Sequence, residues 1–162
     1  MIYFDNNKKA YGYEIPNPIL VIKDELWAQY AGTDKWDIID GQFVDITDTE
    51  EYQAKQAQKE AECIAKLFLT GADVERGIYQ AKGMDFDDIL AFVTANPPQG
   101  LDVKALKIEL KANHFYRGNP YVNAVGALLG FTSEQLDKFF ETNDYTVLLP
   151  VEVEDDNTDN LS

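Results

Sequence analysis

Residues 101–140 read LDVKALKIELKANHFYRGNPYVNAVGALLGFTSEQLDKFF, and this stretch decides the fold of the chain. The segments 117–120 (RGNP) and 129–132 (LGFT) each combine a signal that ends a helix with a signal that begins one. Around them, apolar side chains recur three and four residues apart, which is helical spacing. The stretch therefore predicts three short helices that bury a shared apolar face, and it shows no chemistry.

The same helix start and stop signals recur on the N-terminal side of residue 101. Thr70 and Asp85 are predicted helix caps, while Gly83 and the prolines at 97–98 end the helices that these caps begin. Residues 70–149 are thus predicted to form a helical domain, a compact bundle of about five short helices. After the last helix, residues 145–149 (YTVLL) are a candidate strand.

A longer helix is predicted before this domain. Asp48 followed by Glu51 is a capping-box pattern, and about 20 residues without Gly or Pro come after it. Residues 48–69 are therefore predicted to be a connector helix. Its narrow stripe of small apolar residues also allows pairing with a second copy of the chain.

Residues 1–47 are predicted to form a β-rich unit. Asp40-Gly41 favours a type I′ hairpin turn, with period-two alternation on both sides of it. Trp27, Trp36 and Phe43 are large aromatic residues that so small a unit needs for its core. The expected elements are a hairpin turning at 5–9, a strand at 19–22, a helix at 25–31 and a hairpin at 35–46.

These patterns together predict an α+β fold, with a small antiparallel β-hairpin unit at the N-terminus, a connector helix and a helical bundle. Residues 150–162 (PVEVEDDNTDNLS) are predicted to be a disordered acidic tail, because they offer almost nothing to bury. The start of the chain lacks the basic and apolar segments of a signal peptide. The single cysteine, Cys63, excludes an internal disulfide, and both features indicate a reducing cytoplasm.

The chain of 162 residues carries 29 acidic and 14 basic side chains, a net charge of −15. Such a charge repels nucleic-acid phosphates and anionic lipids, so neither nucleic acid nor membrane is expected as a partner. Two segments, 73–93 and 121–140, have helix-turn-helix length, but the helix that would read the bases has no basic residue in the first (85–93) and only Lys138 in the second (132–141). The charge does leave one alternative open, an acidic inhibitor that occupies the nucleic-acid groove of another protein.

The sequence contains no recognisable catalytic, cofactor or metal motif. Asp85, Asp87 and Asp88 do not match a calcium loop, and they suit the first turn of a helix. His114 has no partner nucleophile at a motif spacing, so His114 and Arg117 are expected to satisfy the last carbonyls of a helix. No phosphate-binding glycine motif occurs. We therefore expect no catalytic residues, no cofactor and no metal, although an enzyme that brings Cys63, His114 or carboxylates together in a pocket stays an alternative.

Residues 101–140 contain more aromatic side chains than one small helical bundle needs for its core. This surplus suggests that some of them cover a partner, a second copy or the β-rich unit. The candidate partner-binding residues are Phe115, Tyr116, Arg117, Tyr121, Phe139 and Phe140.

The N-terminal part of the chain resembles the opening of tail fibre assembly proteins and related small tail proteins of bacteriophages and prophages. The resemblance is carried by Tyr3-Phe4, the segment 15–19 (IPNPI), the segment 23–27 (KDELW), the Asp40-Gly41 turn and the charged helix from Asp48. It covers somewhat over a third of the chain. The C-terminal half is similar to uncharacterised prophage proteins and departs from the fibre assembly proteins.

The resemblance implies a non-enzymatic role for the chain. The expected function is that of a tail fibre assembly chaperone or structural accessory, acting by protein-protein binding. Its expected partner is a tail fibre or other tail protein, with a homo-oligomer as a further possibility. The expected location is the host bacterial cytoplasm during assembly, and then the virion tail if the protein stays attached. The acidic phage-encoded inhibitor of a host nucleic-acid-binding or defence protein remains the alternative function.

Overall fold

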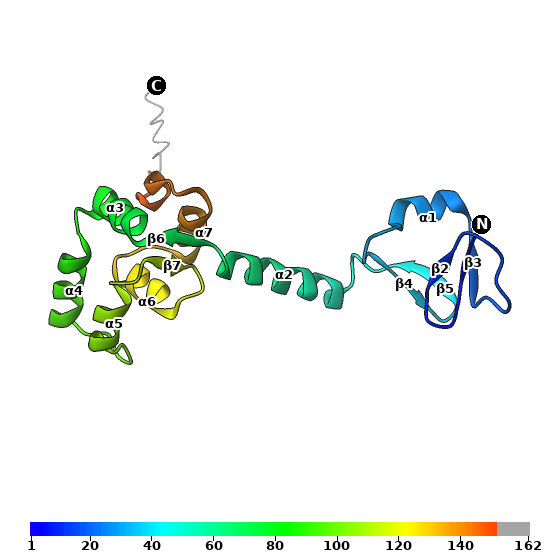
Figure 1. Cartoon of the computed structure of the whole chain (residues 1–162), viewed down its shortest axis with the longest axis horizontal. Coiled ribbons are helices and arrows are strands. Elements are labelled where there is room, and N and C mark those ends of the chain that lie inside the picture. The colour runs from blue at the N-terminus through cyan, green and yellow to red at the C-terminus, as the bar shows by residue number, and fades with distance from the viewer. Residues whose placement is uncertain (152–162) are drawn as a thin grey trace, which may run out of the picture. The chain divides into compact units, whose positions relative to one another are not determined.

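The computed structural model describes residues 1–151 and has the α+β fold that the sequence predicts, with an N-terminal hairpin unit and a helical part. The chain divides into two compact units, Met1–Glu60 and Ala61–Ser162, and the division falls within helix α2 (Glu50–Ala65). Figure 1 shows the elements of each unit. Most of the predicted acidic tail, from residue 152 on, lies outside the described residues.

The N-terminal unit contains two antiparallel sheets, one short helix and the first part of α2. The three-stranded sheet has the order β2-β1-β3, and the two-stranded sheet is the hairpin β4-β5. This hairpin turns at Asp40 and Gly41, which both have positive φ angles, of 51° and 74°. The predicted Asp-Gly turn is thus confirmed. The elements are β1 (Ile2–Phe4), β2 (Ala10–Tyr11), β3 (Leu20–Ile22), α1 (Asp24–Tyr30), β4 (Trp36–Ile39) and β5 (Gln42–Asp45).

The core of the N-terminal unit is built around one fully buried phenylalanine. The Phe4 ring centroid lies 5.4 Å from each of the Trp27 and Trp36 rings and 6.3 Å from the Phe43 ring. Aromatic pairs at such distances add to the stability that burial provides. The prediction that these aromatic residues form the core is confirmed.

Helix α2 is shorter than predicted. The pattern indicated a helix over residues 49–69, but α2 ends at Ala65, and Phe68–Thr70 forms a strand, β6. This strand pairs antiparallel with β7 (His114–Tyr116), which lies in the stretch expected to end a helix. In both strands only the middle residue is buried, and this period-two pattern suits a strand better than a helical turn.

The C-terminal unit has five α-helices within its described residues, as predicted. Thr70 accepts a hydrogen bond from the Asp73 amide, and both Asp85 with Asp88 and Thr132 with Gln135 form capping boxes. The Asp85 cluster therefore has a structural explanation. The helices are α3 (Gly71–Lys82), α4 (Phe86–Ala95), α5 (Val103–Glu109), α6 (Pro120–Leu128) and α7 (Ser133–Thr142).

The predicted strand at residues 145–149 was wrong. Residues Tyr145–Leu148 form a short 3₁₀ helix, in which the Asp144 carboxylate accepts the Thr146 amide proton. This turn packs against α3 and α7 and buries Leu148, which is 2% exposed. The segment is therefore held by the burial of Leu148 and by the Asp144 cap, and not by pairing with another strand.

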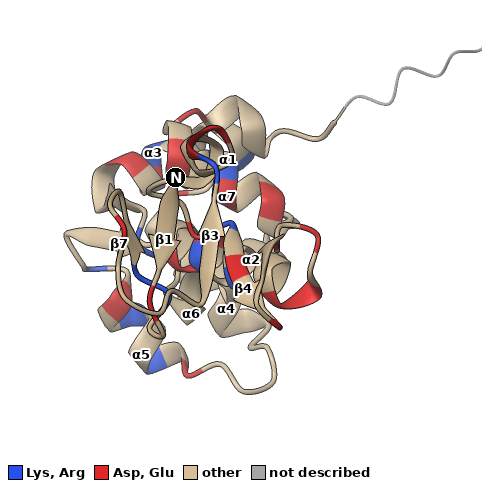
Figure 2. Ribbon diagram, turned by 90° about the vertical axis from the view of Figure 1, so that its right-hand side faces the viewer, with Lys and Arg blue, Asp and Glu red and all other residues tan. Residues whose placement is uncertain are grey.

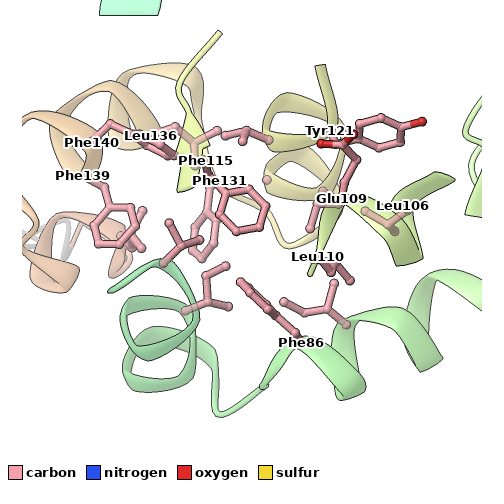
Figure 3. Close-up of a pocket in the computed structure, with 17 residues that line it drawn as sticks. Phe86, Leu106, Glu109, Leu110, Phe115, Tyr121, Phe131, Leu136, Phe139 and Phe140 are labelled. Carbon is pink, nitrogen blue, oxygen red and sulfur yellow. The ribbon is translucent and has the colours of Figure 1, made fainter. Parts of the chain in front are cut away.

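The core of the C-terminal unit contains a small, partly open apolar cavity with a volume of about 50 Å³. The rings of Phe86, Phe115 and Phe131 come from three different segments and meet around it (Figure 3). This space is too small for a drug-sized ligand, since ligand pockets usually measure hundreds of cubic ångströms. We therefore interpret the cavity as a packing void in the core.

Candidate functional site

The β6–β7 sheet of the C-terminal unit presents an aromatic surface to solvent. Phe68 pairs with Tyr116, Leu69 with Phe115 and Thr70 with His114. Because side chains alternate along a strand, the middle pair points into the core and the outer pairs point to solvent. Leu69 and Phe115 are buried, whereas Phe68 and Tyr116 are each 55% exposed.

The outward rings touch one another. The Phe68 centroid lies 5.5 Å from the His114 ring and 5.7 Å from the Tyr116 ring. We call Phe68, His114 and Tyr116 the ribbon face. Its three rings are preassembled, so a partner that packed on them would find a continuous aromatic surface.

Backbone hydrogen bonds extend the pairing beyond both ends of the two short strands. The Gly71 amide donates to the Asn113 carbonyl at 2.8 Å, and the Arg117 amide donates to the Leu67 carbonyl at 2.8 Å. A third bond, 3.1 Å long, joins the Gly118 amide to the Ala65 carbonyl. We call the paired strands β6 and β7 the ribbon. Because these bonds already fix the ribbon, its aromatic side chains would lose little conformational entropy when a partner binds.

Arg117 anchors the ribbon and does not cap a helix, contrary to the sequence prediction. Its side chain is 6% exposed and ion-pairs with Asp137 of α7, with Nε at 2.6 Å from Oδ1. The same guanidinium donates to Asn123 Oδ1 at 2.6 Å and to Ser133 Oγ at 2.8 Å. Arginine suits this position because its planar fork can donate to several acceptors at once. His114, for its part, lies exposed in β7 and not at a helix end.

The six candidate partner-binding residues fall into different environments. Phe115, Phe139 and Phe140 are buried in the core, and Arg117 is held by its ion pair, so none of these four lies on the surface. Tyr121 is half-buried against that core. Tyr116 alone among the six is exposed. The sequence reasoning missed Phe68 and His114, because the three-residue segments FLT and HFY are too short to show an alternating pattern.

A second aromatic surface lies on the N-terminal unit. Tyr3 of β1 is paired with Tyr11 on one side and Val21 on the other, so these three share the face opposite the buried Phe4. Tyr13 extends the row, with its ring 5.6 Å from that of Tyr11. A hydrogen bond from the Tyr11 hydroxyl to Asp5 raises the pKa of Tyr11.

The residues that suggested chemistry include Cys63 and His114. Cys63 and His114 are both exposed and lie in different elements. Within residues 1–151, no group of three or more His, Cys, Asp or Glu side chains is arranged to hold a metal ion. None of the helices in that range has the length and apolarity that crossing a bilayer requires. The described surface does offer exposed aromatic side chains.

Comparison of the chain with protein-family models, with curated proteins and with solved structures finds no match.

Proposed function

We propose that the chain is a non-enzymatic protein that acts by binding another protein, as a tail fibre assembly chaperone or structural accessory of a phage or prophage tail. The observation that carries the binding role is the ribbon face, with two aromatic rings that are 55% exposed on a rigid support. Exposed aromatic residues that touch one another are typical of the centres of protein interfaces. The tail assignment rests on the N-terminal sequence resemblance.

The exposed fractions set the size of the expected contribution to binding. Full burial of a Phe side chain is worth about 1.5–3 kcal/mol, so covering the exposed half of Phe68 gives about 1 kcal/mol. Tyr116 has the same exposed fraction and adds a similar amount. The two together correspond to a change of roughly 30-fold in Kd. That contribution is large enough to measure by substitution.

The distribution of charge favours this proposal over the acidic inhibitor. Residues 1–60 carry twelve acidic and six basic side chains, and residues 61–151 carry twelve acidic and eight basic ones. Figure 2 shows the acidic positions scattered over several elements, with basic positions among them. A protein that imitates nucleic acid needs its carboxylates gathered on one face. The excess charge here suits general solubility better.

Co-expression with a tail fibre gene from the same phage or prophage tests the proposal. We expect the fibre protein to become more soluble and to co-purify with the chain. The variant Phe68→Thr/Tyr116→Thr keeps β-forming residues in the ribbon and is expected to lose most of the co-purification. The matched control is Tyr79→Ala/Phe92→Ala, which removes one exposed Tyr and one exposed Phe from helices α3 and α4.

Three outcomes would count against the proposal. The first is that no tail fibre protein of the same genome co-purifies or gains solubility. The second is that the ribbon variant and the helix control lose binding equally, since the ribbon face would then have no special role. The third is that the chain binds a host nuclease in place of a tail protein, which would support the inhibitor.

A further inference from the structure

Helix α5 carries a basic surface that the proposed function does not use. Lys104, Lys107 and Lys111 are spaced three and four residues apart, and so lie along one side of the helix and its final turn. Ile108 lies within the same stripe and is 71% exposed. The opposite side is anchored in the core by Leu106, which is 1% exposed. We call the three lysines and Ile108 the α5 stripe.

The lysines of the α5 stripe lack acidic partners within residues 1–151. Three other basic groups of the same unit have acidic partners: Arg117 pairs with Asp137, Arg76 with Asp73 and Lys138 with Glu141. No ion pair forms at Lys104, Lys107 or Lys111 among the described residues. In a chain with about twice as many acidic as basic side chains, three adjacent unpaired lysines are a local reversal of charge.

The favourable interaction of cations with the C-terminal end of a helix explains part of this arrangement. Lys107 lies in the last turn of α5, and Lys111 follows it. This effect does not account for Lys104 near the start of the helix, nor for the exposure of Ile108 between the charges. A partner that is both acidic and apolar would satisfy all four side chains.

We propose that the α5 stripe is a docking site for an acidic segment of a partner protein that also carries an apolar side chain to cover Ile108. Charge complementarity selects this occupant, because the rest of the chain is acidic and would repel such a segment elsewhere. The exposed isoleucine favours a peptide over a phosphate polymer, which would offer no apolar side chain to that position. The inference does not depend on the tail assignment.

Fluorescence anisotropy with the full-length protein tests this docking site. The probe is a fluorescein-labelled peptide of alternating Glu and Leu, compared with a Lys-Leu peptide and with single-stranded poly(U) RNA. The test variant is Lys104→Gln/Lys107→Gln/Lys111→Gln. Its matched control is Lys23→Gln/Lys35→Gln/Lys66→Gln, which changes net charge equally at three exposed lysines outside the stripe.

We expect the Glu-Leu peptide to bind the native chain and the control variant with similar affinity, and the stripe variant at least tenfold more weakly. Ile108→Asn should weaken binding severalfold while leaving its salt dependence unchanged, because it removes no charge. Any one of three results would overturn the proposal: no binding up to about 1 mM peptide, equal loss in both lysine variants, or tighter binding of poly(U) than of the peptide. If removal of residues 152–162 strengthens peptide binding threefold or more, the occupant is the chain's own acidic end and not a partner.

Discussion

Removing Asp137 is expected to destabilise the C-terminal unit more than removing Arg117. Asp137→Ala leaves the guanidinium of Arg117, whose side chain is 6% exposed, without its carboxylate. Breaking a buried ion pair costs about 3–5 kcal/mol, and the 33% exposure of Asp137 lowers this to about 2–3 kcal/mol. Arg117→Met leaves hydrogen-bond acceptors on Asp137, Asn123 and Ser133 without their donor, but all three residues reach water. We therefore expect this variant to lower the free energy of unfolding by only about 1–2 kcal/mol.

Two spectroscopic signals separate the units in the unfolding experiment. Both tryptophans, Trp27 and Trp36, belong to residues 1–60, so their fluorescence reports the N-terminal unit alone. Circular dichroism at 222 nm follows mainly the helices of the C-terminal unit. Asp137→Ala should lower the melting temperature of that unit by about 10–20 °C and leave the fluorescence transition unchanged.

The ordering of the two variants decides whether this reasoning holds. If Arg117→Met costs more free energy of unfolding than Asp137→Ala, the penalty of an unpaired buried charge is not the dominant effect. A cost below about 1 kcal/mol for Asp137→Ala would mean that the pair is no anchor. The double variant should cost less than the sum of the two single variants, because both remove the same interaction.

Three further predictions concern the remaining structure. Gly77→Ala would drive its new methyl group into the Phe139 ring and should cost about 1–3 kcal/mol in a urea melt, despite the better helix propensity of alanine. Phe4→Ala removes the centre of the N-terminal core and should cost about 3–5 kcal/mol, abolishing the tryptophan transition but not the helical one. The hydrogen bond from Lys59 lowers the pKa of Asp34 to about 2, below the ordinary value of 3.8. The ionised Asp34 therefore stabilises the folded state above about pH 4, and this stabilisation is lost as the pH falls towards 2. Acid titrations followed by tryptophan fluorescence should accordingly show a weaker pH dependence between 4 and 2 for Asp34→Asn than for the native chain.

The helices of the C-terminal unit were predictable because their ends are decided locally. Thr70, Asp85, Asp102, Asn119 and Thr132 all accept hydrogen bonds from backbone amides at helix starts, as their residue types indicate. The Asp40-Gly41 hairpin was predictable for the same reason, since positive φ angles at a turn favour these residues. Such signals act within a few residues and are therefore readable without the fold.

The β6–β7 ribbon was missed because its pairing joins residues far apart in the sequence. Thr70 faces His114 across the two strands, and three-residue strands are too short for periodicity to stand out. The same limit explains the misplaced role of Arg117, whose ion-pair partner Asp137 lies twenty residues away. The candidate site depends on these long-range contacts, so a list of aromatic residues alone could not separate Tyr116 on the surface from Phe115 in the core.

The most direct test of the central claim is hydroxyl-radical footprinting of the chain alone and in complex with a tail fibre protein. This method reads the solvent exposure of individual aromatic side chains. We predict that Phe68 and Tyr116 become protected in the complex, while Tyr79 and Phe92, which are 60% and 41% exposed, are oxidised as before. Protection at Tyr79 and Phe92 with the ribbon face still reactive would contradict the claim that this face is where the partner binds.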